Sequence, residues 1–175
     1  VASLVGSEMC IRDRPGGELY TALQTGVIDA TEWVGPYNDL AFGFQQIAKY
    51  YYFPGWHEPG SMLEFIINLD AWNELPTHLQ SIVKTAAKAV NQDLLDEYTA
   101  MNNQALRELI DVHNVQLKKL PDDVINEFRV ISKSVLDEIA ENDKQFKSIY
   151  ESYLKFKSEV VSYHEISEDA YTKIR

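Results

Sequence analysis

Two glutamates lie close to tryptophans in the first third of the chain. Glu32 directly precedes Trp33, and Glu58 follows Trp56 by two positions, with a Gly/Pro turn shortly after each pair. Aromatic walls combined with one or two fixed carboxylates suit a pocket for a small polar ligand or a metal ion. The alternative for each glutamate is a solvated surface position beside a core tryptophan.

The residues after the first turn add polar groups to the same region. Tyr37 and Asn38 could hydrogen-bond a carboxylate or keto oxygen of a ligand. Asn38 and Asp39 could equally cap a following helix, because short polar side chains favour that position. His57 is not assigned to metal binding, because the next histidine, His78, falls on a predicted helix without ligand spacing to it.

Composition limits the classes of protein that fit. The chain has 175 residues, of which 45% are hydrophobic and 25% charged, enough for a domain of ordinary size with a core. Its net charge is -11 and its sequence pI is near 4.7, which argues against binding to nucleic acid or an anionic membrane. No apolar run approaches the roughly 18 residues that a membrane-spanning helix needs.

The first fourteen residues differ from the rest of the chain. They have no helical or strand period, and they resemble the translated read-through of a sequencing adapter. We therefore treat residues 1–14 as a non-native leader and leave them out of the fold prediction. The alternative is a short native segment. Cys10, the single cysteine, falls within them, so no disulfide framework is expected.

The elements that must position the pocket residues form a mixed first half. A short helix is predicted after Gly16, ending at Gly26, and a second one after Pro36. Short strands are expected over residues 27–33, 50–53 and 62–69, because each is a compact apolar or β-branched run.

The second half is predicted to be almost entirely helical. Apolar residues recur at spacings of three and four from Leu79 to Val112, which indicates a single long helix with one buried stripe. A short strand at residues 115–117 and a second long helical stripe after Pro121 follow. Residues 141–143 interrupt that stripe, and we expect a kink or break there.

Three runs of sequence together resemble a known family. The runs are Pro15-Gly16-Gly17-Glu18-Leu19-Tyr20, residues 26–39 and residues 50–60. They resemble the substrate-binding subunits of TRAP transporters of the DctP type, especially the subgroup that captures 2-oxo acids or lactate with a bound cation. The resemblance covers about residues 15–165. It implies a helix-rich α/β fold: the C-terminal lobe of a two-lobe periplasmic-binding-protein-like fold, plus long brace and tail helices. Residues 15–120 would form the partial ligand-binding lobe with the brace helix, and residues 121–175 the helical tail.

The resemblance also implies roles for individual residues. Glu32 would ligate the cation, Na⁺ or Ca²⁺, together with Glu58 and the backbone carbonyl of Trp33. Such hard cations prefer oxygen ligands, so the residue types are compatible with that role. The organic acid would lie against the side chains of Trp33, Tyr37, Asn38 and Trp56.

The implied function is that of a periplasmic solute-binding subunit, not an enzyme, that delivers a small organic acid to a membrane permease. The family usually clamps the ligand carboxylate with an arginine, which is expected upstream of this sequence, so we expect the chain alone to bind weakly. The aromatic-rich stripe over residues 146–163 suggests a homodimer through the C-terminal helix. An alternative is that this helix folds across the first lobe. The competing functions are a helical interaction protein, or a hydrolase using Glu32 and Glu58 as a carboxylate pair.

Overall fold

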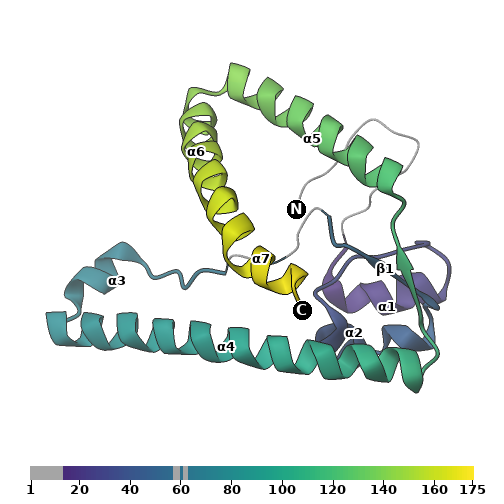
Figure 1. The fold of residues 1–175 in the computed structure, drawn as a ribbon. Coiled ribbons are helices and arrows are strands. Elements are labelled where there is room, and N and C mark those ends of the chain that lie inside the picture. Colours follow the sequence, from purple (N-terminus) through teal and green to yellow (C-terminus); the bar gives the residue numbers. More distant parts are fainter. Residues whose placement is uncertain (1–13, 57–59, 61–62) are drawn as a thin grey trace. The chain divides into compact units, whose positions relative to one another are not determined.

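The computed structural model describes residues 14–56, 60 and 63–175. The chain divides into two compact units, Val1–Lys119 and Leu120–Arg175. Helices dominate both units, and the described part of the first unit also holds a two-stranded sheet (Figure 1). In the described part of the chain, no helix has the combination of length and apolar character that crossing a bilayer requires.

The first unit begins with two short helices, both at predicted places. Helix α1 spans Gly16–Gln24, carries Glu18 in its first turn and buries Leu19 and Ala22. Helix α2 spans Pro36–Phe42, where proline occupies a first-turn position that needs no N–H donor. Gly43 ends α2 with a φ of 85°, a left-handed conformation that glycine adopts without strain, and a short 3₁₀ helix, η1, covers Phe44–Gln46.

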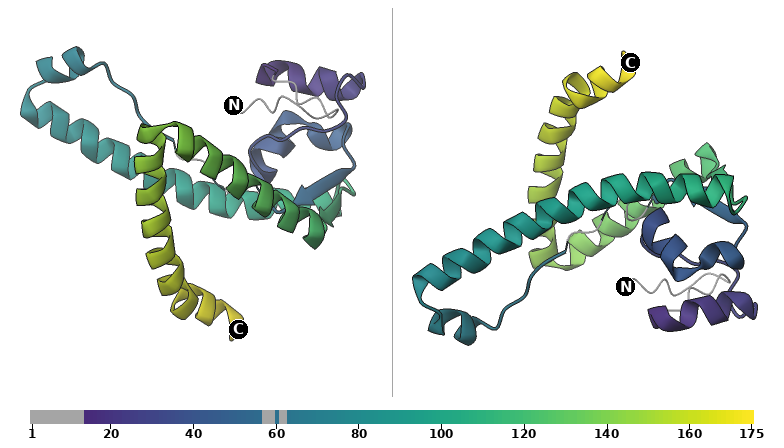
Figure 2. Two further views of the ribbon diagram at one scale, coloured as in Figure 1. Left: turned by 90° about the horizontal axis from the view of Figure 1, so that it is seen from above. Right: turned by 90° about the horizontal axis from the view of Figure 1, so that it is seen from below.

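The sheet joins two predicted strands that lie far apart in the sequence. Strand β1 (Tyr50–Phe53) pairs in parallel with β2 (Gln116–Lys119), and Tyr51 lies opposite Leu117. The crossover between them contains α3 (Leu69–Glu74) and α4 (Thr77–Asp111), and α2 packs against the C-terminal half of α4 (Figure 2). The buried apolar residues of the described chain lie in α1, in η1, towards the C-terminus of α4 and directly before β2: Leu19, Ala22, Phe44, Ala105, Leu109 and Val115.

Two predicted strands are absent from the described residues. Residues 27–33 form turns and irregular backbone, and residues 63–68 run without a strand partner. The prediction that residues 62–69 form a buried strand is therefore wrong for the described part, since Phe65 is 74% and Ile66 80% exposed. An apolar run alone does not make a strand, because its backbone N–H and C=O groups need a neighbouring strand.

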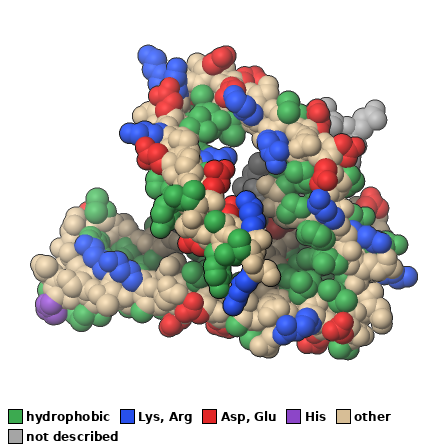
Figure 3. Space-filling view, viewed as in Figure 1, with side chains coloured by type: hydrophobic (Ala, Val, Ile, Leu, Met, Phe, Trp, Pro, Cys, Tyr) green, Lys and Arg blue, Asp and Glu red, His purple; other side chains and the backbone are tan. Residues whose placement is uncertain are grey.

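The predicted long helix is confirmed as α4, but its continuous buried stripe is not. Only Ala105 and Leu109 of α4 are buried among the described residues. Towards its N-terminus, α4 and α3 border an open apolar groove of about 340 Å³, and Figure 3 shows green hydrophobic side chains exposed in this region. The groove is lined by Phe65, Ile67, Leu69, Trp72, Val83, Lys84 and Ala87.

The second unit is a chain of three helices. Helix α5 spans Asp122–Asn142, α6 spans Lys144–Ile166 and α7 spans Glu168–Lys173. The predicted break is confirmed, because Asp143 ends α5 and caps α6 by accepting hydrogen bonds from the N–H groups of Gln145 (2.8 Å) and Phe146 (2.9 Å).

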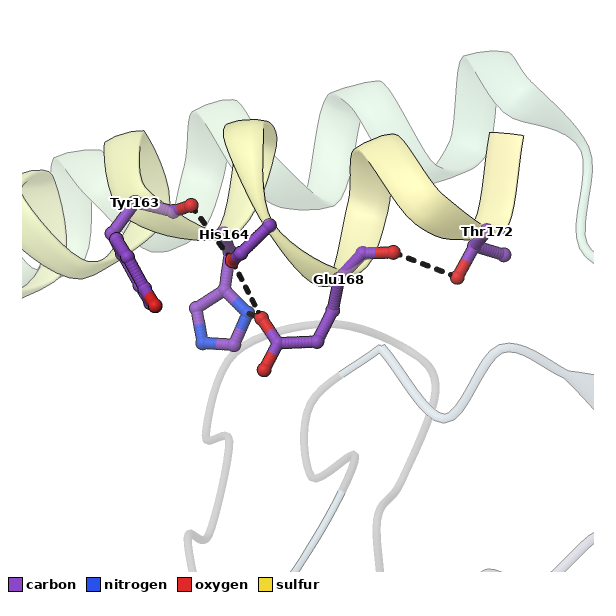
Figure 4. Close-up of polar contacts among 5 residues, drawn as sticks. Tyr163, His164, Glu168 and Thr172 are labelled. Carbon is purple, nitrogen blue, oxygen red and sulfur yellow. Dashed lines mark hydrogen bonds and ion pairs between the residues drawn. The ribbon is translucent and has the colours of Figure 1, made fainter. Parts of the chain in front are cut away.

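A group of polar contacts lies at the junction of α6 and α7 (Figure 4). Ser167 Oγ lies 2.8 Å from the Tyr163 carbonyl and 2.7 Å from Glu168 Oε2, which is also 2.9 Å from His164 Nδ1. The hydrogen bond from Ser167 is the main cause that lowers the pKa of Glu168 below its ordinary value of 4.5. These contacts hold the carboxylate at the start of α7, where a negative charge is favourable.

Candidate functional site

The candidate site is the loop that carries Glu32 and Trp33 between α1 and α2. The Trp33 ring is half-buried, with its centroid 5.0 Å from that of Phe42 in a tilted arrangement. The ring also lies directly over Gly16, where a Cβ atom would come within 2.6 Å of Trp33 Cη2. Because Gly16 has no side chain, it leaves the space in which the Trp33 ring packs against α1.

Glu32 lies on the exposed side of this loop. The Thr31 hydroxyl donates a hydrogen bond of 3.1 Å to the Glu32 backbone carbonyl. The pKa of Tyr51 is raised well above its ordinary value of 10.0, first by burial, then by its hydrogen bond with Asp39 and the charge of Asp39, and finally by the charge of Glu32. The charge of Glu32 is the smallest of these contributions to the pKa of Tyr51.

Asp39 is a residue that the sequence indicated only as a helix cap. The residue is 8% exposed, and among the described residues it is the charged residue that is buried. Its Oδ2 accepts a hydrogen bond of 2.5 Å from the Tyr51 hydroxyl, and its Oδ1 accepts longer ones from the N–H groups of Val34 (3.4 Å) and Gly35 (3.3 Å). Burial raises the pKa of Asp39 above its ordinary value of 3.8, and the three hydrogen bonds oppose that rise.

Tyr37 is fixed against α4. Its backbone N–H donates a hydrogen bond of 2.9 Å to Asn102 Oδ1, and its ring meets that of Tyr98 edge-on at 5.9 Å. Asn38 is half-buried, and its Oδ1 atom is buried with no hydrogen-bond partner recorded among the described residues. The sequence offered Asn38 and Asp39 as possible caps of α2. The side chain of Asp39 accepts a hydrogen bond from the Gly35 N–H at the start of that helix.

The other half of the predicted pocket is described only in part. Trp56 follows β1 and is 39% exposed, whereas Glu58 and His57 lie outside the described residues. Within residues 14–56, 60 and 63–175, no three His, Cys, Asp or Glu side chains gather in a way that could hold a metal ion. The structure thus brings Glu32, Trp33, Tyr37 and Asn38 together around one turn, and their ligand roles stay predictions.

The chain belongs to a family of solute-binding proteins. The DctP family, described as bacterial extracellular solute-binding protein family 7, matches residues 9–143. A monocarboxylate 2-oxoacid-binding periplasmic protein of Nostoc sp. (strain PCC 7120) is 40% identical over 157 residues, which are 90% of this chain and 43% of the relative.

Solved structures show the same fold. A TRAP periplasmic solute-binding protein from Pseudoalteromonas atlantica T6c, with bound sodium and pyruvate, is 36% identical with a TM-score of 0.86, covering 93% of this chain and 49% of that one. One from Bordetella bronchiseptica RB50, a dimer with calcium and picolinate, is 33% identical with a TM-score of 0.85, covering 93% and 48%. The chain thus spans about half the length of the relatives that it matches.

These findings decide between the predicted classes of protein. The resemblance to the DctP family and the helix-rich fold of a single lobe are confirmed. The family consists of solute-binding proteins and not of enzymes, so it does not support the two-carboxylate hydrolase or the helical interaction protein. The family match begins at residue 9, so it includes the last six of the fourteen residues predicted to be a non-native leader.

Proposed function

We propose that this chain forms the C-terminal lobe of a periplasmic solute-binding subunit of a TRAP-type importer. The subunit captures a small organic acid, such as a 2-oxo acid or lactate, together with a cation and delivers it to a membrane permease. The observation that carries the proposal is the likeness, over 93% of the chain, to a protein with bound sodium and pyruvate. The 2-oxoacid-binding relative from Nostoc supports the same class of ligand.

The loop between α1 and α2 and the segment after β1 would provide the binding groups. The carboxylates of Glu32 and Glu58 and the backbone carbonyl of Trp33 would ligate Na⁺ or Ca²⁺, because both ions prefer oxygen ligands. Trp33, Tyr37, Asn38 and Trp56 would line the organic acid. The exposed position of Glu32 and the fixed positions of Trp33 and Tyr37 support these assignments.

Calorimetric titration tests the proposal. The protein for this experiment, here called the extended protein, is residues 15–175 of this chain preceded by the amino-terminal half of the Pseudoalteromonas relative. We expect it to bind pyruvate in the presence of Na⁺ or Ca²⁺ and much more weakly without either. Glu32→Ala should abolish the cation-dependent part of binding, whereas Glu127→Ala, which removes an exposed glutamate of α5, should not. Equal affinity of the parent and Glu32→Ala with cation present would remove Glu32 from the site.

We also propose that α6 mediates a homodimer. Its exposed apolar and aromatic side chains would form a costly patch on an isolated protomer, and a dimeric relative supports pairing in this family. The exposed apolar and aromatic residues of α6 are Ile149, Tyr153, Leu154, Phe156, Val161, Tyr163 and Ile166. In the alternative arrangement, the helix packs on the other lobe of its own protomer.

Light scattering of the extended protein separates the two arrangements. A dimeric mass at micromolar concentration that becomes monomeric on Phe146→Glu with Tyr153→Glu supports pairing through α6. The matched control replaces Lys155 and Ser162, exposed polar residues on the opposite side of the same helix, with glutamate, and it should stay dimeric. A monomeric parent would contradict the dimer.

A further inference from the structure

Asp39 has an arrangement of contacts that helix capping alone does not explain. Two of its hydrogen-bond donors, the N–H groups of Val34 and Gly35, belong to the loop that carries Glu32 and Trp33. The third, the Tyr51 hydroxyl, belongs to β1. A carboxylate that only stabilised the seven residues of α2 would have no need of the bond to the strand.

The bond to Tyr51 is the strongest of the three. Its length of 2.5 Å is typical of a hydroxyl donating to a carboxylate, whereas the bonds to the two N–H groups are long at 3.3–3.4 Å. Because this bond is part-buried, water competes for it less than at an exposed position, which strengthens it. The short bond therefore anchors Asp39 to the sheet, and Asp39 in turn holds the loop.

A second polar contact fixes the same turn from the side of α4. Asn102 Oδ1 accepts the N–H of Tyr37, and it also lies 3.3 Å from the position that a Cβ on Gly35 would occupy. The turn at Gly35 is thus enclosed between Asp39 on one side and Asn102 on the other. Two side chains from different elements define where this backbone lies.

We infer that Asp39, anchored by Tyr51 and assisted by Asn102, is a positioning residue that holds the Glu32–Trp33 loop in its cation-binding geometry. This inference rests on the proposed function, because the geometry matters only if Glu32 and the Trp33 carbonyl bind a cation. Metal ligands need positions fixed to within a fraction of an ångström, and residues behind them provide that order. Asp39 then acts by holding the backbone and not by ligating the ion.

Tyr51→Phe is the sharpest test, because it removes one hydroxyl and keeps the ring. The matched control is Tyr52→Phe on the same strand, where the side chain is 57% exposed. In the extended protein, we expect Tyr51→Phe to weaken Ca²⁺-dependent pyruvate binding about tenfold, the effect of losing roughly one hydrogen bond to a charged group. Tyr52→Phe should bind like the parent.

Amide hydrogen exchange distinguishes positioning from a general loss of stability. In the 175-residue chain, Tyr51→Phe should raise the exchange rates of the Val34 and Gly35 amides and leave those of Ala105 and Leu109, in the core of α4, unchanged. A uniform rise at all four amides would show a merely structural role and overturn the inference.

The outcomes also separate this inference from the proposed function. If the parent binds pyruvate with a cation and Tyr51→Phe binds equally well, the inference fails and the proposed function stands. If the parent shows no cation-dependent binding of pyruvate, both fail.

Discussion

Replacing Gly16 by alanine is a direct test of how Trp33 is placed. A Cβ at this position would come within 2.6 Å of Trp33 Cη2 and 2.9 Å of Cζ3. Both distances are shorter than carbon atoms tolerate, so the helix or the indole ring must move. Gly17, the next residue of α1, provides a matched control, because a Cβ there would meet nothing within 4 Å.

The two variants should change stability in opposite directions. Alanine in place of glycine at a compatible backbone conformation stabilises a protein by about 0.4–1 kcal/mol, because it restricts the unfolded chain, and Gly17→Ala has this gain without a clash. Gly16→Ala has the same gain but also the cost of overpacking, typically about 1–3 kcal/mol. The free energies of unfolding should therefore differ by roughly 1–3 kcal/mol, with Gly16→Ala less stable.

Urea unfolding followed by tryptophan fluorescence measures this difference. With a denaturant slope of about 2 kcal/mol/M, the midpoints of the two variants should differ by roughly 0.5–1.5 M. Gly16→Ala should also weaken pyruvate binding by the extended protein, because the displaced indole belongs to the proposed pocket. Equal midpoints for the two variants would refute the packing of Trp33 on α1.

Three further predictions concern the core, the buried carboxylate and the N-terminal segment. Leu109→Ala should lower the free energy of unfolding by about 3 kcal/mol, because Leu109 is 2% exposed. Leu95→Ala, at a 60% exposed site of the same helix, should lower it by less than about 1 kcal/mol, and urea unfolding measures both. Because burial raises the pKa of Asp39, the folded state binds its proton more tightly than the unfolded state does. The free energy of unfolding of the parent, relative to that of Asp39→Asn, should therefore fall as the pH rises from about 4 through the raised pKa. Urea titrations at pH 4 to 7 measure this, and a constant difference between the two proteins would contradict it. Deleting residues 1–14 should leave the thermal midpoint unchanged, and a drop of several degrees would identify a native element there.

The elements that follow from local sequence were predictable. Helices α1 and α2 begin at a Gly/Pro signal, α4 follows from an unbroken period of three and four, and Asp143 marks the break between α5 and α6 because the apolar stripe stops there. Each of these signals acts within a few residues of chain. Local sequence indicates the two short runs that form β1 and β2, but not that they pair with each other.

The errors and omissions involve contacts that local sequence does not encode. Residues 63–68 have the composition of a strand, but in the described chain they lie beside no strand that could accept their hydrogen bonds. The bond between Asp39 and Tyr51 spans twelve residues, and that between Tyr37 and Asn102 spans 65. An aspartate in the first turn of a short helix is an ordinary cap in sequence, and only the fold shows that it also reaches the sheet.

Burial assigns different tasks to the two carboxylates of this region. Asp39 is enclosed, and both of its oxygens accept hydrogen bonds from the loop and the strand, so a cation would have to displace donors to reach it. Glu32, seven residues earlier, is exposed on the loop that Asp39 holds. A charge that must meet a diffusing ion together with its organic acid has to lie at the surface, whereas a charge that orders a backbone is more effective when water is excluded. The sequence places both acids within a few residues, and the structure buries Asp39 and leaves Glu32 exposed, which is the arrangement that their two proposed roles require.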